Sequence, residues 1–317
     1  MVPATRSRVL RKWAIRAGGS AAFLALLFWL LPRDAIVAAI TRVPPSTFLL
    51  ITLAFMASHV AAAAKWWLVI GRPVPFLFAL RAHYGGLAAN LCLPGAIGGD
   101  AMRAAVVHGA AGNAPNLAAG AVFDRLVDVV ALIILSLGGL MVLRAEGVDG
   151  QVSALAAVGL IAVAVIVFVL MPQAIRAVWR LAPRLPGGDF AQRTADSMQA
   201  LTVRPVFLAS LVTVSTAIQG TLVYLSWLLA AAAGLEIPLE IWAFAWPLAK
   251  ILAILPISLN GLGVREASLA ALLVPFGAVS ATVVAGGLAW QGVLFLTGAI
   301  GGLILLSGQQ ARKIAET

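Results

Sequence analysis

The sequence predicts an all-α, polytopic membrane protein, and two observations support this prediction. Of the 317 residues, 62% are hydrophobic and only 11% are charged, whereas soluble domains average roughly 45–50% and about 25%. Apolar segments long enough to cross a bilayer recur along the chain, separated by polar connections. Because backbone polar groups must be satisfied internally in lipid, we expect one integral membrane domain over 1–317 that contains only helices.

Basic residues fall in the connections between the apolar segments. A formal charge of +10 would suggest nucleic acid as the partner of a soluble protein, but cytoplasmic loops of membrane proteins show the same bias. We therefore expect no nucleic-acid partner. We also expect a multi-pass protein of a prokaryotic inner (cytoplasmic) membrane with both termini in the cytoplasm. Spans are expected at 17–31, 47–70, 115–143, 151–171, 206–233 and 280–306.

Two further segments, 76–109 and 241–275, are apolar but interrupted. The first contains LPGAIGGDAMRAAVV from Leu93, and the second contains LPISLNGLGVREASL from Leu255. Each passes through Leu-Pro and a glycine-containing turn and reaches an arginine nine positions after the proline. Such backbone is tolerated at membrane depth only inside protein or beside water, so we interpret both as re-entrant, broken helices. Two ordinary loops between helices are the alternative. The residues of interest are Gly98, Gly99 and Arg103 in the first motif, and Asn260, Gly261, Gly263 and Arg265 in the second.

The order of segments is the same in both halves of the chain. Residues 1–149 and 150–317, approximately, each contain three spans and one broken element. An odd number of crossings inverts the second half relative to the first. Inverted repeats with broken helices that meet near the midplane are common in secondary transporters, so this architecture favours transport.

The span 115–143 carries Asp124, Arg125 and Asp128. Asp128 lies about 20 Å along this helix, near the middle of the bilayer. Ionisable groups at that depth normally face a partner or a water-filled cavity. Arg125 and Asp128 could form a purely structural pair, because they are three residues apart. Asp124 is better placed for a partner on another element, such as Arg103.

Arg103 and Arg265 each follow a glycine-containing turn at the expected start of a half-helix. Free backbone N–H groups and the helix dipole favour an anion there, and guanidinium matches the geometry of phosphate. A phosphate-sized site is therefore one interpretation. In the alternative, Arg265 pairs with Glu266, and Arg103 pairs with Asp100 or Asp124. Lys250 is the next candidate for binding an anion.

LPGAIGGDAMR followed by Asp124-Arg125, together with LPISLNGLGVREA, resembles the flippase-like membrane domain family typified by the transmembrane part of lysylphosphatidylglycerol synthases. The likeness covers nearly the whole chain. It implies an all-helical fold with re-entrant segments and a role in moving or handling lipids. The chain ends at Thr317 without the soluble aminoacyl-transfer domain of the full synthases, so the resemblance does not imply lysyl transfer.

The function we expect is a lipid translocase for an anionic phospholipid or a polyprenyl-phosphate-linked lipid. No cofactor, metal or catalytic group is expected, because His59, His83 and His108 lack metal-ligand spacing. We interpret them as lone polar or interfacial side chains. Gly98-Gly99-Asp100 lacks the lysine of a P-loop. The alternatives are a membrane-embedded transferase acting on a lipid phosphate and an accessory subunit of a lipid-modifying system. A homo-oligomer or a lipid-synthesis enzyme as partner is compatible with the sequence.

Overall fold

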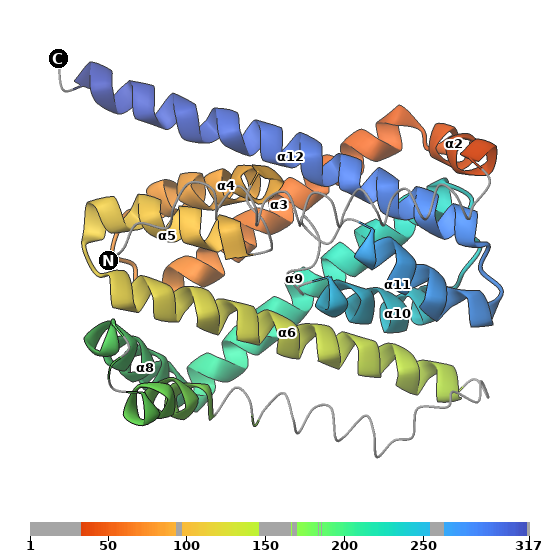
Figure 1. Ribbon diagram of the computed structural model, residues 1–317. Helices are drawn as coiled ribbons and strands as arrows, with labels where there is room; N and C mark the ends of the chain where they lie inside the picture. The colour runs from red at the N-terminus through yellow and green to blue at the C-terminus, as the bar shows by residue number, and fades with distance from the viewer. Residues whose placement is uncertain are drawn as a thin grey trace.

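The computed structural model describes residues 33–92, 97–145, 166, 170–182, 184, 186–253 and 263–315, and every regular element in them is a helix (Figure 1). Within this part of the chain, four helices are long and apolar enough to cross a membrane: α3 (Pro45–Val69), α6 (Ala114–Ala145), α9 (Pro205–Ala232) and α12 (Ser280–Ala315). The prediction of a helical, multi-pass membrane protein is confirmed. The predicted span 17–31 and nearly all of 151–171 lie outside the described residues.

Local sequence explains where the long helices begin. Pro45 and Pro205 occupy the first turns of α3 and α9, where a missing N–H costs nothing and the fixed φ already suits a helix. α3 ends before Gly71, which adopts a φ of 81°, a left-handed conformation that glycine reaches without steric cost. These four helices start within two residues of the predicted positions.

Two pairs of short helices occupy the segments predicted to be broken. The first pair is α4 (Phe76–Cys92) and α5 (Ile97–Ala111), and the second is α10 (Leu239–Leu252) and α11 (Val264–Leu273). At 1.5 Å per residue, even the 17 residues of α4 extend only about 25 Å, less than the roughly 30 Å hydrocarbon core. Figure 1 shows the two pairs at opposite ends of the long helices. The re-entrant and inverted-repeat arrangements stay predictions.

Three smaller elements complete the described structure. They are α2 (Arg33–Arg42), α8 (Gly188–Thr202) and the short 3-10 helix η1 (Val274–Phe276). Residues 170–181 are also helical. α8 packs against α6 at the end where α9 begins (Figure 1).

Glycines bring the short helices close to their neighbours. A Cβ on Gly86 of α4 would lie 2.7 Å from the carbonyl oxygen of Gly99 in α5, and one on Gly139 of α6 would lie 2.7 Å from backbone atoms of α10. Small residues allow this close approach between membrane helices. Gly98 and Gly99 belong to the first turn of α5, so the expectation that they form a turn before the helix was wrong; close packing against α4 explains Gly99.

Gly301 of α12 offers a direct test of this packing. A Cβ there would fall against the backbone carbonyl of Tyr84 in α4, whereas one on Gly302 would meet only the Ala88 side chain at 3.5 Å, an ordinary contact. We expect Gly301→Ala to lower the free energy of unfolding by about 1–3 kcal/mol, the usual cost of overpacking. Gly302→Ala should be neutral or slightly stabilising. Thermal unfolding of both variants in detergent checks this, and equal melting temperatures would contradict it.

Candidate functional site

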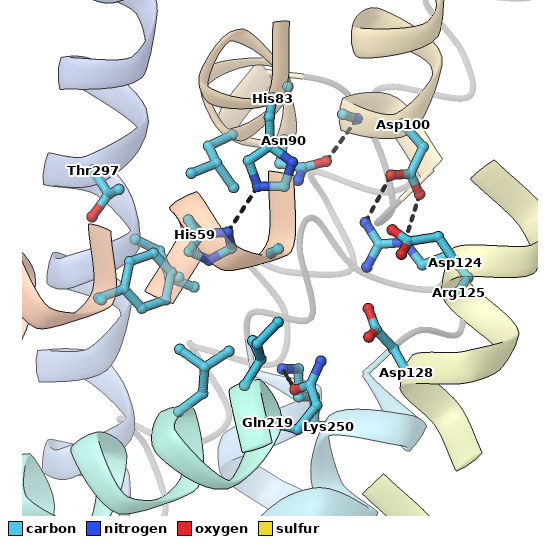
Figure 2. Close-up of a pocket in the computed structure, with 18 of the residues that line it drawn as sticks. His59, His83, Asn90, Asp100, Asp124, Arg125, Asp128, Gln219, Lys250 and Thr297 are labelled. Atoms are coloured by element: carbon cyan, nitrogen blue, oxygen red, sulfur yellow. Dashed lines mark hydrogen bonds and ion pairs between the residues drawn. The ribbon is translucent and has the colours of Figure 1, made fainter. Parts of the chain in front are cut away.

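A cavity of about 210 Å³ lies at the centre of the molecule, and its wall has two chemically different sides. Asp100, Asp124, Arg125 and Asp128 gather on one side, from α5 and α6 (Figure 2). Apolar side chains from α3, α6, α9, α10 and α12 form much of the rest of the wall. They are Phe55, Leu132, Ile218, Leu222, Trp246, Trp290 and Leu294. The cavity is therefore amphipathic, and we call it the central cavity.

Six ionised side chains form a continuous series of ion pairs along the charged side, which we call the charge network. In order, they are Arg125, Asp100, Arg103, Asp124, Lys65 and Asp128. The nitrogen-to-oxygen distances of the first four links are 2.5, 2.8, 2.9 and 3.1 Å, and Lys65 and Asp128 form the last pair. Cations and carboxylates alternate, so the network has no net charge. This balance is what makes burial of so many charges tolerable.

Burial differs along the charge network. The side chains of Lys65, Arg103 and Asp124 are only 2%, 5% and 6% exposed, whereas those of Arg125 and Asp128 are 41% and 19% exposed. The centre of the network is thus nearly inaccessible, although its side chains belong to the cavity wall, and its two ends are more exposed. The end groups are the ones that could meet a ligand without breaking the central pairs.

The pairings resolve the alternatives that the sequence left open for α6. Asp124 pairs with Arg103 at 2.9 Å, which confirms its expected partner on another element. Arg125 pairs with Asp100, and Asp128 pairs with Lys65 and accepts a hydrogen bond from Ser215 of α9. A local pair between Arg125 and Asp128 is therefore not needed to account for either charge.

Lys65 belongs to the candidate site, although its sequence position did not predict this. Its place near the end of the predicted span 47–70 suggests a basic residue at the cytoplasmic surface, but Lys65 is buried in α3 and bridges Asp124 and Asp128. It also donates to Ser215 Oγ at 3.1 Å. The signal was present, because Lys65 stands between four alanines and two tryptophans with no other charge nearby. A lysine inside an apolar segment normally faces a polar partner or a water-filled cavity.

His59 and His83 form a second polar group beside the charge network (Figure 2). His59 Nδ1 and His83 Nε2 are 3.0 Å apart, and Arg103 Nη1 lies 3.4 Å from His83 Nδ1. The expectation of lone histidines was wrong for these two. Since guanidinium only donates, His83 Nδ1 accepts and a neutral His83 carries its proton on Nε2. His59 Nδ1 then accepts from His83, so a neutral His59 carries its proton on Nε2 as a further donor.

Lys250 of α10 also lines the central cavity and lies below Asp128 in the view of Figure 2. Its ammonium donates to Gln219 Oε1 at 2.7 Å and lies 4.9 Å from the centre of the Trp246 ring. Neither partner neutralises the charge. In the part of the chain that the structure describes, no carboxylate lies within ion-pair distance of Lys250. Lys250 therefore remains a candidate for binding an anion.

The second arginine motif is closed by its own carboxylate. Arg265 Nη2 is 2.5 Å from Glu266 Oε1, and Glu266 Oε2 accepts from the backbone N–H of Gly263 at 2.7 Å. Glu266 is fully buried, and it caps α11 while it neutralises Arg265. Gly263 has a φ of 83°, which favours glycine. Arg265 also lines the central cavity.

Both motif arginines are thus paired with carboxylates, as the alternative interpretation of each had it. Recognition of phosphate by Arg103 and Arg265 stays a prediction. Asn260 and Gly261 lie outside the described residues. Among the residues that are described, no three His, Cys, Asp or Glu side chains are grouped so that they could hold a metal ion.

Thiol labelling can test whether the central cavity admits water. We expect a cysteine at Leu222, which lines the cavity, to react with a small cationic thiol reagent in a Cys92→Ala background. Leu229 lies seven residues further along α9, fully buried in the hydrophobic core, so a cysteine there should stay unmodified. The extent of labelling is read by mass spectrometry of the membrane-embedded protein. Equal labelling at both positions, or none at either, would contradict a hydrated cavity.

A family of sequences described as the lysylphosphatidylglycerol synthase TM region matches residues 13–302, nearly the whole chain. A search among curated proteins found no match.

Proposed function

Because the chain belongs to the family of lysylphosphatidylglycerol synthase TM regions, we propose that it is a translocase that moves an anionic, phosphate-bearing lipid across the membrane. Membership of the family identifies a membrane protein linked to lipid handling. The finer assignment, an anionic phospholipid or a polyprenyl-phosphate-linked lipid, rests on the chemistry of the central cavity.

Lys250 is the observation that carries this proposal. It lines the cavity, as the cations of the charge network do, but its contacts are an amide and an aromatic ring and not carboxylates. An intramembrane cation of this kind marks a substrate or ion pathway. A phosphate would neutralise it and form a charge-assisted hydrogen bond. The ligand is therefore expected to be an anion.

The size and polarity of the central cavity favour a lipid head group. Its volume, about 210 Å³, is below the roughly 300–1,000 Å³ of sites that enclose drug-sized ligands. A phosphate head group would contact the charged side, whereas the aromatic and aliphatic side would receive the first carbons of the acyl chains. The remainder of the chains would stay in the bilayer.

The carboxylates beside Arg103 and Arg265 fit a pathway in which the anion changes partners. Buried guanidinium needs a counter-ion at all times, and Asp100, Asp124 and Glu266 supply it when no lipid is bound. A phosphate entering from either side could replace one carboxylate at a time. We propose two inverted half-sites, with the one around Arg103 reached from the cytoplasm and the one around Arg265 reached from outside.

Reconstitution in liposomes tests the proposal. We expect Lys250→Gln to slow translocation of a fluorescent anionic phospholipid by roughly tenfold, since one charge-assisted bond is worth about 1.5–3 kcal/mol. Lys250→Arg keeps the charge and should retain most activity. The readout is the fraction of label that an external quencher reaches, compared with a zwitterionic analogue.

Two outcomes would contradict the proposal. The first is equal translocation by wild type and Lys250→Gln, and the second is a wild-type rate without preference for the anionic lipid. Thin-layer analysis of the same liposomes separates transport from chemistry, because a transferase would produce a new lipid species.

A further inference from the structure

A second cavity lies where several helices end at one face of the molecule. Its volume is about 390 Å³, and it is lined by the last residues of α3 and α8 and the first turns of α6 and α9. Because α3, α6 and α9 are membrane-crossing helices, their ends mark the boundary of the bilayer. This cavity shares no lining residue with the central cavity. We call it the interfacial groove.

The interfacial groove carries a single sign of charge. Its ionisable lining residues are Arg72, after the end of α3, and Arg204, before the start of α9. Among the residues that the structure describes, no ion pair involves either arginine. Two arginines from different elements thus border one groove without a counter-ion, and this arrangement favours an anion.

Arg72 is held in an unusual backbone conformation. Its φ of 58° lies in the left-handed region, the only such value for a non-glycine residue among those described. The backbone N–H donates to Trp67 O at 3.0 Å, and the guanidinium lies 5.2 Å from the centre of the Trp67 ring. Glycine would adopt this conformation at lower cost. The backbone conformation of this turn does not require an arginine. Arg72 nevertheless occupies it and places a guanidinium in the lining of the interfacial groove.

The interfacial groove has a hydrogen-bonded helix junction on one side and apolar side chains in its lining. Asn116 of α6 donates from Nδ2 to Ile70 O at 2.8 Å, which joins the start of α6 to the end of α3. Leu68, Leu201 and Phe207 add apolar surface. Close to it in the chain, Val206 is 83% exposed at the start of α9. An amphipathic ligand fits this combination better than a free anion does.

We propose that the interfacial groove binds the phosphate group of an anionic phospholipid of the adjacent leaflet. Arg72 and Arg204 would contact the phosphate oxygens, and the acyl chains would leave along the apolar side. The positive-inside bias assigns this face to the cytoplasm. The lipid bound here is distinct from the one we propose to be transported, and its binding does not depend on Lys250.

Native mass spectrometry of the full-length protein tests this site. Dioleoyl phosphatidylglycerol is titrated against the protein in detergent, and the bound lipid is counted. We expect the Arg72→Gln, Arg204→Gln variant to bind this lipid about tenfold or more weakly at one site, because two charge-assisted bonds are lost. The control variant, Arg180→Gln with Arg193→Gln, removes the same charge from exposed positions outside the groove and should bind like wild type.

The source of the phosphate is separated by two further ligands. Inorganic phosphate and phosphatidylcholine are added in place of phosphatidylglycerol, and neither should displace it at equal concentration. Displacement by inorganic phosphate would overturn the assignment to a lipid. Equal affinity in the Arg72→Gln, Arg204→Gln variant and in wild type would overturn the site.

Photocross-linking of the wild-type protein tests the site without any substitution, so the result does not depend on whether a variant folds. Phosphatidylglycerol with a diazirine near its head group should label peptides that contain residues 68–72 or 197–207. Labelling there in Lys250→Gln as well would show that the site is separate from the transport pathway. Labelling restricted to the central cavity would overturn the proposal.

Discussion

Replacing Lys65 with methionine is expected to lower the free energy of unfolding by about 3–5 kcal/mol, the usual cost of removing one partner from a buried ion pair. Lys65 bridges Asp124 and Asp128 while its side chain is only 2% exposed. Methionine has a similar length but cannot neutralise either carboxylate. Thermal unfolding in detergent micelles, together with the yield of folded protein, measures the loss.

A compensated variant separates charge from packing. Asp128 is the more exposed of the two carboxylates, so Lys65→Met with Asp128→Asn restores electroneutrality while Arg103 still neutralises Asp124. We expect this double variant to recover at least half of the lost stability, because neutral groups of similar shape often replace buried ion pairs at little cost. If the double variant is as unstable as Lys65→Met, packing of the lysine stem, not charge, determines the loss.

The lengths of the apolar segments and the positions of proline and glycine predicted most of the fold. Length and hydropathy predict both ends of α3, α6 and α9 within two residues, because a helix needs a roughly fixed number of apolar residues to cross the bilayer. The start of α12 was also predicted, but this helix continues past the predicted end at 306 to Ala315. Proline and glycine in the two motifs predicted the breaks between α4 and α5 and between α10 and α11. These are local signals, and local signals are readable in one sequence.

The partners in the candidate site were harder to predict. Lys65, Asp124 and Ser215 meet from three helices that are far apart in the chain, and the hydrophobic pattern does not specify how helices rotate against one another. The contact between His59 and His83, which are 24 positions apart, was not predictable for the same reason. The pair of Asp124 and Arg103 was predicted. Arg125 follows Asp124 directly in the helix and is poorly placed to pair with it, so a partner on another element was expected.

The two motif arginines provide the other large expected effect. If a guanidinium recognises the phosphate of the transported lipid, its loss should slow transport even when the buried charge stays balanced. Arg103→Gln with Asp124→Asn, and Arg265→Gln with Glu266→Gln, each remove one cation and one carboxylate. Each pair should slow translocation roughly tenfold, since each removes one charge-assisted bond to the phosphate. The two pairs together should slow it more than either pair alone.

Both charge-neutral pairs of substitutions are expected to leave the protein folded. Glutamine at position 266 can still accept the hydrogen bond that caps α11 through Gly263, and asparagine at position 124 has nearly the shape of aspartate. Melting temperatures and chromatographic profiles close to wild type are the control, and liposome translocation of anionic and zwitterionic phospholipids is the readout. Wild-type transport by both pair-neutral variants would show that Arg103 and Arg265 serve only as counter-ions of their carboxylates. Lys250 would then carry the recognition of the anion without them.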